Sequence, residues 1–471
     1  MNTKFNMLNG KQINIPDETI NELKSQLTGK VISSIEKEYD EERKIWNGMI
    51  DRKPALIVKC MGTADVVHTV KFARQHGILV TVKGAGHNIA GNSIADGALL
   101  IDLSLMKSVR VNPKTQKVLV DPGATLRNLD HETQLFGLAV PVGINSTTGI
   151  SGLTLGGGFG WISRSYGLTI DNLISAEIVT ADGNVVFADE KDNADLFWGI
   201  RGGSGNFGIV TQYQFKLHPV GPNVLAGLLI HPYEDAKKVF NHYREFVSKA
   251  PDKLTCWVVL RKAPPLPFLP ADVHGKEILV IAAVYSGDIK EGEKILAPLR
   301  SFGNPIADVI SPVPFEAWEQ ALDPLLTPGA RNYWKSHFFT EISDGLIDTL
   351  IEFTGSLPSP LTEIFFGQLG GAINKVPVDA TAYPHRDAEF VMNIHARWEN
   401  EPQDEICIKW ARKLFDSTAQ YSNGAVYVNF ISEGDDRINA AFGPNHERLS
   451  KIKRKYDPDN FFRMNQNILP A

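Results

Sequence analysis

Apolar and polar positions in the first half of the chain follow two different periods. Residues 63–73 carry apolar side chains at helical spacing, and apolar runs at 55–60 and 78–82 flank them. We therefore expect a strand–helix–strand unit. Further short apolar runs, each bounded by Gly, Asp, Asn or Pro, predict strands at 98–103, 109–111, 117–120, 174–180 and 209–217.

The pattern changes at both ends of the chain. Residues 1–50 are polar, and the stretch after Pro16 has the form of a helix start, so we expect a helical N-terminus. Near the C-terminus, residues 427–430 are expected to form a strand and residues 447–456 a basic helix.

Pro219 and the Gly221-Pro222 pair form the most pronounced break in the chain. Beyond them, strands are expected at 228–230, 255–260, 278–285 and 363–367, alternating with amphipathic helices at 233–247 and 289–301. Strands and helices in this order predict an antiparallel sheet with helices on one face. We therefore expect a first domain at 1–219, a second at 220–425 and a C-terminal segment at 426–471.

A glycine-rich loop at 83–91 follows the second predicted strand and contains a single imidazole, His87, between Gly84, Gly86 and Gly91. Glycine allows positive φ and close approach of the backbone to a ligand. Successive free N–H groups in such a loop form a concavity that binds anions such as a pyrophosphate. His87 could coordinate a metal, transfer a proton or be bonded covalently to a cofactor, and the loop alone leaves these three roles open.

Two more glycine-rich loops follow, at 143–160 and 199–208. The stretch 140–160 contains seven glycines interleaved with hydroxyl residues and with Ile144, Leu153 and Phe159. Flexible Gly/Ser linkers lack such apolar residues, so a linker is disfavoured. Three such loops within the first domain predict one extended cofactor with several contact regions. None of them gives a Walker-type loop or a clean G-x-G-x-x-G in a βαβ unit, which disfavours P-loop nucleotidases and nicotinamide enzymes of the Rossmann type.

Composition and charge narrow the class of protein. The chain has 471 residues, 43% of them hydrophobic, and a formal net charge of −6, which argues against a nucleic-acid partner. Its three cysteines are far apart and predict no disulfide framework. No signal peptide, membrane span, metal-binding spacing of histidines or G-x-S-x-G elbow is visible, so we expect a cytoplasmic enzyme or binding protein without a metal.

Taken together, the three loops resemble the FAD domain of the vanillyl-alcohol oxidase / p-cresol methylhydroxylase superfamily. Within it the berberine bridge enzyme-like branch is most similar, because 83–88 resembles its site of flavin attachment through histidine. Residues 427–430 and 456–470 resemble its C-terminal signature. The resemblance implies an α+β fold: a two-part FAD-binding domain of the p-cresol methylhydroxylase type, a substrate domain with an antiparallel sheet flanked by helices, and a C-terminal segment that returns to the FAD domain.

The resemblance also implies how FAD is held. His87 is the expected covalent attachment point. Relatives with two covalent links use a cysteine eleven positions before the Gly-Gly-Gly run, and this chain has Asn145 there. A histidine-only link is therefore implied, as in 6-hydroxynicotine oxidase-like bacterial members. The other expected cofactor-binding residues are Lys83, Gly84, Ala85, Gly86, Asn88, Gly91, Asn92, Ser104, Pro141, Gly143, Asn145, Thr147, Thr148, Gly149, Gly152, Leu155, Gly156, Gly157, Gly158, Gly160, Trp161, Tyr166, Gly208, Val210, Asn465 and Gln466.

Catalysis is expected at the C-terminal strand, which carries active-site groups in the family. Tyr427 is the expected base, assisted by Tyr166, and it would need its pKa lowered from about 10 by nearby charge or hydrogen bonds. A role for Tyr427 in packing alone has nearly equal weight. Tyr333, Gln368, Tyr383 and His385 are further candidates for lining a substrate pocket, although structural roles account for them at least as well.

The function implied is hydride transfer from a CH–OH or CH–NH carbon of a sugar, alcohol or nitrogen heterocycle to the flavin, of the EC 1.1.3 or 1.5.3 type. Thr148 falls where relatives control oxygen access and is nearly isosteric with valine, which favours oxygen as the acceptor. A flavin dehydrogenase with another electron acceptor and a non-catalytic flavoprotein are the alternatives. The sequence leaves the substrate and the oligomeric state open.

Overall fold

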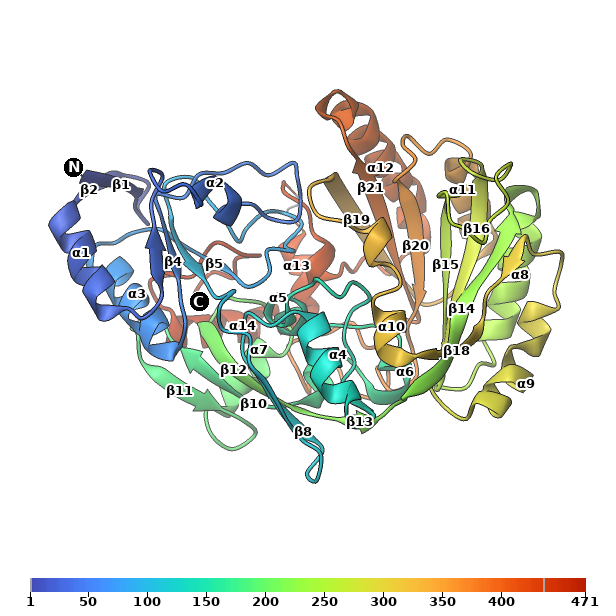
Figure 1. Cartoon of the computed structure of the whole chain (residues 1–471), viewed down its shortest axis with the longest axis horizontal. Helices are drawn as coiled ribbons and strands as arrows, with labels where there is room; N and C mark the ends of the chain where they lie inside the picture. Colours follow the sequence, from blue (N-terminus) through green and yellow to red (C-terminus); the bar gives the residue numbers. More distant parts are fainter. Residues whose placement is uncertain (1, 435–436) are drawn as a thin grey trace.

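The apolar runs of the first half pair into two separate sheets. In the computed structural model, which describes residues 2–434 and 437–471, the first sheet has the strand order β3-β4-β6-β5. β4 and β5 both run parallel to β6, so the expected strand–helix–strand unit is present, with α3 as its crossover (Figure 1). The elements of this part are β1 (Asn2–Asn6), β2 (Gln12–Pro16), α1 (Asp17–Gln26), β3 (Lys30–Ile32), α2 (Tyr39–Glu42), β4 (Leu56–Lys59), α3 (Thr63–Gln75), β5 (Val80–Lys83) and β6 (Leu99–Asp102).

The N-terminal 50 residues are less helical than expected. The helix after Pro16 is present as α1, but an antiparallel hairpin of β1 and β2 precedes it. Phe5 and Ile15 lie on this hairpin and are buried in the core of the first sheet. These strands contain few apolar residues, and because polar residues surround them, the two-residue alternation typical of a strand is not recognisable in the sequence.

The second sheet is antiparallel, with the order β11-β10-β12-β8-β7. Its core also includes buried residues of the C-terminal segment, among them Val426, Leu449 and Ile468. The elements of this part are β7 (Val109–Asn112), β8 (Lys117–Val120), α4 (Leu126–Gln134), β9 (Leu138–Ala139), α5 (Ile150–Leu155), α6 (Ser163–Tyr166), β10 (Leu173–Val179), β11 (Val185–Ala188), α7 (Ala194–Ile200), β12 (Ile209–Lys216) and β13 (His218–Pro219).

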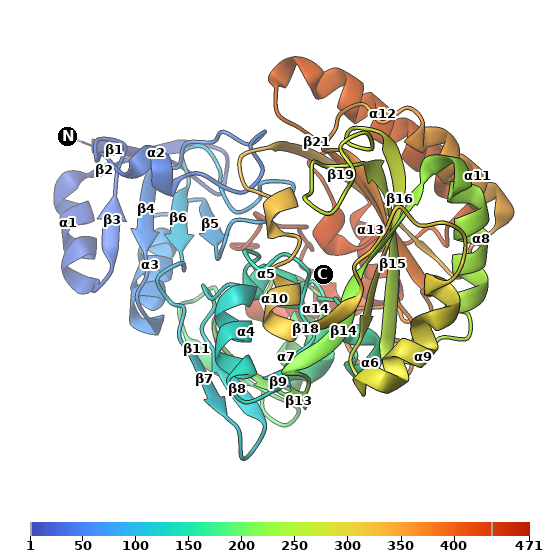
Figure 2. The same cartoon turned by 45° about the vertical axis from the view of Figure 1, so that its right-hand side comes forward.

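A large antiparallel sheet follows, with the order β17-β14-β16-β15-β20-β21-β19 and with β18 paired to β14. As the alternation predicted, helices cover one face: α8, α9, α11 and α12 lie over the outer side (Figure 2). The elements are β14 (Asn223–Pro232), α8 (Ala236–Val247), β15 (Leu254–Lys262), β16 (Glu277–Tyr285), α9 (Ile289–Arg300), β17 (Ala307–Asp308), β18 (Ser311–Pro314), α10 (Phe315–Glu319), β19 (Arg331–Phe339), α11 (Asp344–Thr354), β20 (Glu363–Gln368), β21 (Phe390–Trp398) and α12 (Asp404–Thr418).

The two faces of this sheet have different partners, because successive side chains of a strand point to opposite sides. Val258 of β15 and Ile364 of β20 pack under the helices. Their neighbours Trp257 and Phe365 face the other way, toward Phe159 and Trp161 of the second glycine-rich loop. The inner face of the large sheet therefore meets the first half of the chain.

The C-terminal segment crosses back to the second sheet. It contains α13 (Ile438–Phe442) and α14 (His446–Tyr456), and α14 matches the expected basic helix. The strand expected at 427–430 is instead the 3₁₀ turn Val428–Phe430. Phe430 packs edge-on against Tyr427 in this turn, with ring centroids 4.8 Å apart. In the described part of the chain, no helix is long and apolar enough to span a membrane.

Two buried carboxyl groups meet where α4 packs against α10. Asp130 and Glu319 are 1% and 2% exposed, and Asp130 Oδ1 and Oδ2 and Glu319 Oε2 have no hydrogen-bond partner among the described residues. Burial, together with the charge of Glu316, raises the pKa of Asp130 to about 8. Burial, with the charges of Asp130 and Asp323, raises the pKa of Glu319 as well.

We expect this pair to make stability fall as pH rises from about 4 to about 8. In that range the unfolded chain releases the proton of Asp130 and the folded chain keeps it, so the free energy of unfolding falls by up to about 1.4 kcal/mol per pH unit. Asp130→Asn removes this titration and should flatten the pH dependence of the thermal midpoint. Glu132→Gln on the exposed side of α4 is the control. If the thermal midpoint of Asp130→Asn changed with pH as steeply as that of the wild type, the result would contradict a protonated Asp130 in the folded protein.

Candidate functional site

The first glycine-rich loop leaves β5 after Lys83 and turns back toward the N-terminal region. Gly86 and Gly91 have φ values of 75° and 73°. A Cβ atom on Gly91 would lie 2.7 Å from Cγ2 of Ile50, so both conformation and space require glycine there. Lys83 itself points away from the loop and pairs with the buried Asp102 of β6 at 2.8 Å. It ties the two strands together and does not line the cavity, so its position gives no support to the expected contact with the cofactor.

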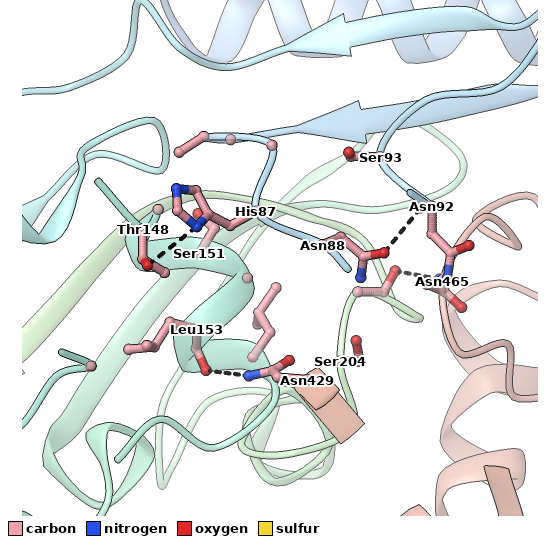
Figure 3. Close-up of a pocket in the computed structure, with 18 of the residues that line it drawn as sticks. His87, Asn88, Asn92, Ser93, Thr148, Ser151, Leu153, Ser204, Asn429 and Asn465 are labelled. Carbon is pink, nitrogen blue, oxygen red and sulfur yellow. Dashed lines mark hydrogen bonds between the residues drawn. The ribbon is translucent and has the colours of Figure 1, made fainter. Parts of the chain in front are cut away.

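His87 lies in a large cavity between the loops. Its Nδ1 is 3.4 Å from Thr148 Oγ1 (Figure 3). Its Nε2 is 3.0 Å from Thr147 Oγ1, and its ring stacks on Trp46 at a centroid distance of 5.2 Å. Burial lowers the pKa of His87 to about 3, although the hydrogen bond with Thr147 opposes the shift. The imidazole is therefore neutral at physiological pH and keeps a lone pair on one ring nitrogen.

The cavity has a volume of about 300 Å³ and is bounded by all three loops and the C-terminal segment. Asn92, directly after the first glycine-rich loop, contacts the C-terminal segment, since its Nδ2 donates to Gln466 Oε1 at 3.3 Å. Of the residues expected to bind a cofactor, those lining the cavity are Gly84, Ala85, Gly86, His87, Asn88, Asn92, Gly143, Asn145, Thr148, Gly149, Gly152, Leu155, Gly208, Val210, Asn465 and Gln466.

The remaining expected residues do not line the cavity. The glycines at 156–160 are needed for packing: a Cβ on Gly156 would lie 2.3 Å from Asn429 Oδ1, and one on Gly160 would lie 1.7 Å from the carbonyl oxygen of Val142. A single sequence cannot separate glycine that faces a ligand from glycine that faces protein. Besides Lys83, Gly156 and Gly160, the residues placed outside the cavity lining are Gly91, Ser104, Pro141, Thr147, Gly157, Gly158, Trp161 and Tyr166.

Ser104, Trp161 and Tyr166 make structural contacts away from the cavity. The backbone N–H of Ser104 donates to Asp102 Oδ1 at 2.8 Å, and Trp161 stacks on Trp257 of the large sheet with centroids 4.0 Å apart. The hydroxyl of Tyr166 donates to the carbonyl of Pro219, and its ring stacks on His218. Its position gives no support to the expected roles of Tyr166 in catalysis and cofactor binding.

Tyr427 does line the cavity, and its surroundings differ from those expected of a base. Its hydroxyl oxygen accepts hydrogen bonds from the Gly158 N–H at 2.9 Å and from Asn429 Nδ2 at 3.0 Å. Both bonds favour the phenolate, but burial outweighs them and raises the pKa of Tyr427 to about 12. At neutral pH Tyr427 is therefore a protonated hydroxyl whose own hydrogen is available to a ligand.

The large sheet contributes one wall of the cavity, and there the neighbour of an expected pocket residue takes its place. Trp334 lines the cavity, whereas its neighbour Tyr333 points to the outer core, where its hydroxyl accepts from Arg412. A shift of one position along a strand exchanges the two faces of a sheet. The lining residues that were not among the expected site residues include Trp46, Ser93, Ser151, Leu153, Phe159, Ser204, Trp257, Trp334, Phe365, His395, Asn429, Phe430 and Met464.

The other expected pocket residues are buried in structural contacts. Gln368 accepts from the Cys256 N–H at 3.1 Å, and His385 Nε2 is 2.8 Å from the carbonyl of Ala441. Tyr383 packs behind the cavity wall, with its ring 6.4 Å from that of Tyr427. Strand alternation in 331–339 and 363–368 was the signal that could have identified Trp334 and Phe365, but the register of the strands is needed to know which face is inward.

The cavity has the features that a large, polar, planar cofactor such as FAD requires. Ser93 Oγ and Asn465 Oδ1 are buried without a hydrogen-bond partner among the described residues. A Cβ atom at Gly152 or at Gly205 would meet no protein atom within 4 Å, so these backbones border open space. Buried polar atoms without partners are costly unless a ligand or water satisfies them. No group of His, Cys, Asp or Glu in the described ranges could hold a metal ion.

Comparisons with known proteins agree with this site. Residues 54–189 match the family model described as FAD binding domain, and 426–469 match the model described as berberine and berberine like. An FAD-linked oxidoreductase of Dictyostelium discoideum is 32% identical, with 96% of this chain and 97% of that protein covered. The (R)-6-hydroxynicotine oxidase of Paenarthrobacter nicotinovorans is 28% identical over 94% of this chain and 97% of that protein.

A solved structure has a similar fold over nearly the whole chain. The crystal structure of 6-hydroxy-D-nicotine oxidase from Arthrobacter nicotinovorans superposes with a TM-score of 0.85 at 25% identity, covering 94% of this chain and 98% of that one. The similarity extends over all three parts of the chain, including the large sheet in which local sequence signals are weakest.

Proposed function

The chain belongs to the berberine bridge enzyme-like branch of the FAD-linked oxidoreductases, and we propose that it oxidises a CH–OH or CH–NH carbon of a small organic substrate and passes the electrons to oxygen. The observation that carries the proposal is the shared cavity. One end lies among the glycine-rich loops around His87, and the other lies against the inner face of the large sheet. A cofactor and a substrate can therefore meet inside it.

In this proposal the loops hold FAD and His87 is its only covalent anchor. The neutral imidazole of His87 has a lone pair for the bond, and Thr147 and Thr148 hold its ring in place. Asn145 occupies the position where a second link would need a cysteine. Cys60, Cys256 and Cys407 are buried and do not line the cavity. When bound, FAD supplies the two-electron acceptor that the side chains lack.

The substrate would lie between the aromatic wall and the cofactor. Trp257, Trp334, Phe365 and Phe430 line the cavity with aromatic rings. Such surfaces favour a flat or ring-shaped substrate, since aromatic contacts are strongest for offset or edge-on ring pairs. The Tyr427 hydroxyl, held by Gly158 and Asn429, would donate a hydrogen bond to the substrate or to the cofactor and so orient it.

The proposal predicts that substrates will bleach the flavin absorption. Purified protein should be mixed without oxygen with 6-hydroxynicotine, an aromatic secondary alcohol and a reducing disaccharide in separate stopped-flow experiments. We expect at least one to reduce the flavin, because the cavity admits ring-shaped compounds. A flavin that none of them reduces would favour a non-catalytic flavoprotein.

Mixing the reduced protein with air-saturated buffer then tests the electron acceptor. Rapid reoxidation with formation of hydrogen peroxide is expected for an oxidase. Reoxidation over many minutes would contradict oxygen as the acceptor and favour the dehydrogenase alternative. Thr148, which lines the cavity beside His87, is the residue whose replacement should change this rate.

A further inference from the structure

A second histidine lines the same cavity, on the opposite wall from the glycine-rich loops. His395 comes from β21, and sequence reasoning gave no role to it. In the sheet it lies directly between Glu363 of β20 and Trp334 of β19, each being its register partner on one side. Residues that face each other across neighbouring strands point to the same side of a sheet. The three side chains therefore form one cross-strand row on the inner face.

His395 and Glu363 form a hydrogen-bonded pair with a fixed orientation. Nδ1 of His395 is 3.0 Å from Glu363 Oε1, and Arg261 Nη1 donates to Glu363 Oε2 at 2.6 Å. Burial would raise the pKa of Glu363, but the charge of Arg261, the hydrogen bond and charge of His395 and the charge of Arg397 outweigh it and lower the pKa to about 2. Glu363 is therefore ionised, and an ionised carboxylate only accepts hydrogen bonds.

Whenever the imidazole of His395 is neutral, its hydrogen therefore lies on Nδ1, facing Glu363, and its lone pair lies on Nε2. Among the described residues Nε2 has no hydrogen-bond partner, and it is not among the buried unpaired atoms, so it is accessible from the cavity. The ring is held on both sides: Trp334 stacks on it at 4.4 Å and Phe365 lies parallel at 6.2 Å. A carboxylate that fixes the tautomer of a histidine is the arrangement that general-base catalysis requires.

We propose that His395 is the catalytic base of this enzyme and that Glu363 is its positioning residue. This inference rests on the proposed function. As the substrate carbon gives up a hydride to FAD, the O–H or N–H hydrogen on the neighbouring atom passes as a proton to Nε2. A C=O or C=N bond forms, the carbon loses two electrons and the flavin gains them. Glu363 stabilises the imidazolium formed, and solvent later removes the proton.

Tyr427 is the other candidate for this role, and its electrostatics disfavour it. Burial raises the pKa of Tyr427 to about 12, and both hydrogen bonds to its oxygen come from neutral donors. His395 instead has an ionised partner already in contact. The charged groups around the pair are Glu363 itself, Arg261 of β15 and Arg397 of β21, and on the β19 side the ring of His395 stacks on the indole of Trp334. The cavity thus offers a hydroxyl donor in Tyr427 and a proton acceptor in His395.

The first test needs no substrate. Protein labelled with ¹⁵N in its histidines should be examined by NMR at pH 8, with His395→Gln used to assign the signal. We expect a protonated Nδ1 and an unprotonated Nε2 for His395 in the wild type. In Glu363→Gln this preference should be lost. A hydrogen fixed on Nε2 in the wild type would overturn the proposal, and so would an unchanged tautomer in Glu363→Gln.

The second test measures the rate of flavin reduction at pH 8 without oxygen, with the most reactive compound from the panel above. General-base catalysis typically contributes a factor of about 10² to 10⁴, so His395→Gln should reduce flavin at least about 100-fold more slowly. The His395→Gln variant keeps the Glu363–Arg261 pair, so its fold should be preserved. An unchanged flavin spectrum would verify that the fold is intact. His242→Asn, on the outer helix α8 and outside the cavity, is the control and should react like the wild type.

In His395→Ala, added imidazole should restore part of the rate, because the truncated side chain leaves space for it. A His395→Gln protein that binds flavin and is reduced as fast as the wild type would overturn the assignment of the base and leave the proposed function standing. A wild-type flavin that no compound reduces would instead overturn the proposed function, and the catalytic role of His395 with it.

Discussion

Replacing His87 with alanine is expected to abolish covalent attachment of FAD. Denatured wild-type protein should keep its yellow colour in the acid precipitate and show the intact mass of the chain plus one FAD. Denatured His87→Ala protein should release all its flavin and show the mass of the bare chain. His87 is the expected sole anchor because Asn145 replaces the second attachment residue and the three cysteines are buried outside the cavity.

The native His87→Ala protein should still bind FAD, because the loops and the C-terminal segment remain. His76→Ala, at the end of α3 and outside the cavity, is a control that should keep the covalent link. His395→Gln should keep it too, although His395 shares the cavity with His87. Covalent flavin in His87→Ala would show that another residue forms the bond and would refute the tether.

Replacing Lys453 with methionine is expected to destabilise the protein strongly. Lys453 and its partner Asp457 are both fully buried, with Lys453 Nζ 2.7 Å from Asp457 Oδ2. The ammonium also donates to the carbonyls of Asn206 and Phe462, and Asp457 accepts from the Phe461 and Phe462 N–H groups. Removing one partner of a buried ion pair leaves the other charge uncompensated, which typically costs about 3–5 kcal/mol.

This network fastens the C-terminal segment to the third glycine-rich loop, so the effect should reach the flavin. Met464 and Asn465 line the cavity a few residues beyond Asp457. We expect a lower urea midpoint and, in the His87→Ala background, faster loss of non-covalent FAD. Lys451→Met is the matched control, since the Lys451–Glu447 pair on the same helix is exposed and worth at most about 1 kcal/mol. Equal midpoints for the two variants would contradict the role of the buried pair.

The regular elements of the fold were predictable wherever a local pattern repeats. The strand–helix–strand unit, strands β7, β8, β10 and β12 of the second sheet and helices α8, α9 and α14 lie close to their expected positions, whereas no strand was expected at β11. The misses occurred where tertiary contacts override local preference. The β1–β2 hairpin carries only a few apolar residues, and 427–430 form a 3₁₀ turn whose ring contacts come from distant segments.

In the candidate site, too, the parts formed by residues close in sequence were predictable, and the parts formed by distant residues were not. Gly84, Ala85, Gly86 and Asn88 beside His87 line the cavity, whereas Gly91 of the same loop packs against Ile50, so the glycine pattern located the cavity without deciding which glycines line it. The opposite wall was not predictable. Trp334 and His395 reach the cavity only because β19, β20 and β21 pair in one register, and a shift of one residue would present Tyr333 instead.

The amino-acid sequence by itself determined the cofactor class and the family, since both depend on glycine, histidine and asparagine at short, fixed spacings. Only the tertiary structure decided which glycines and which side chains line the cavity. It also decided the charge states, because desolvation and charge partners come from residues distant in the chain. That is why Tyr427, the expected base, is a protonated hydroxyl, and why Glu363, paired with Arg261 and His395, is ionised.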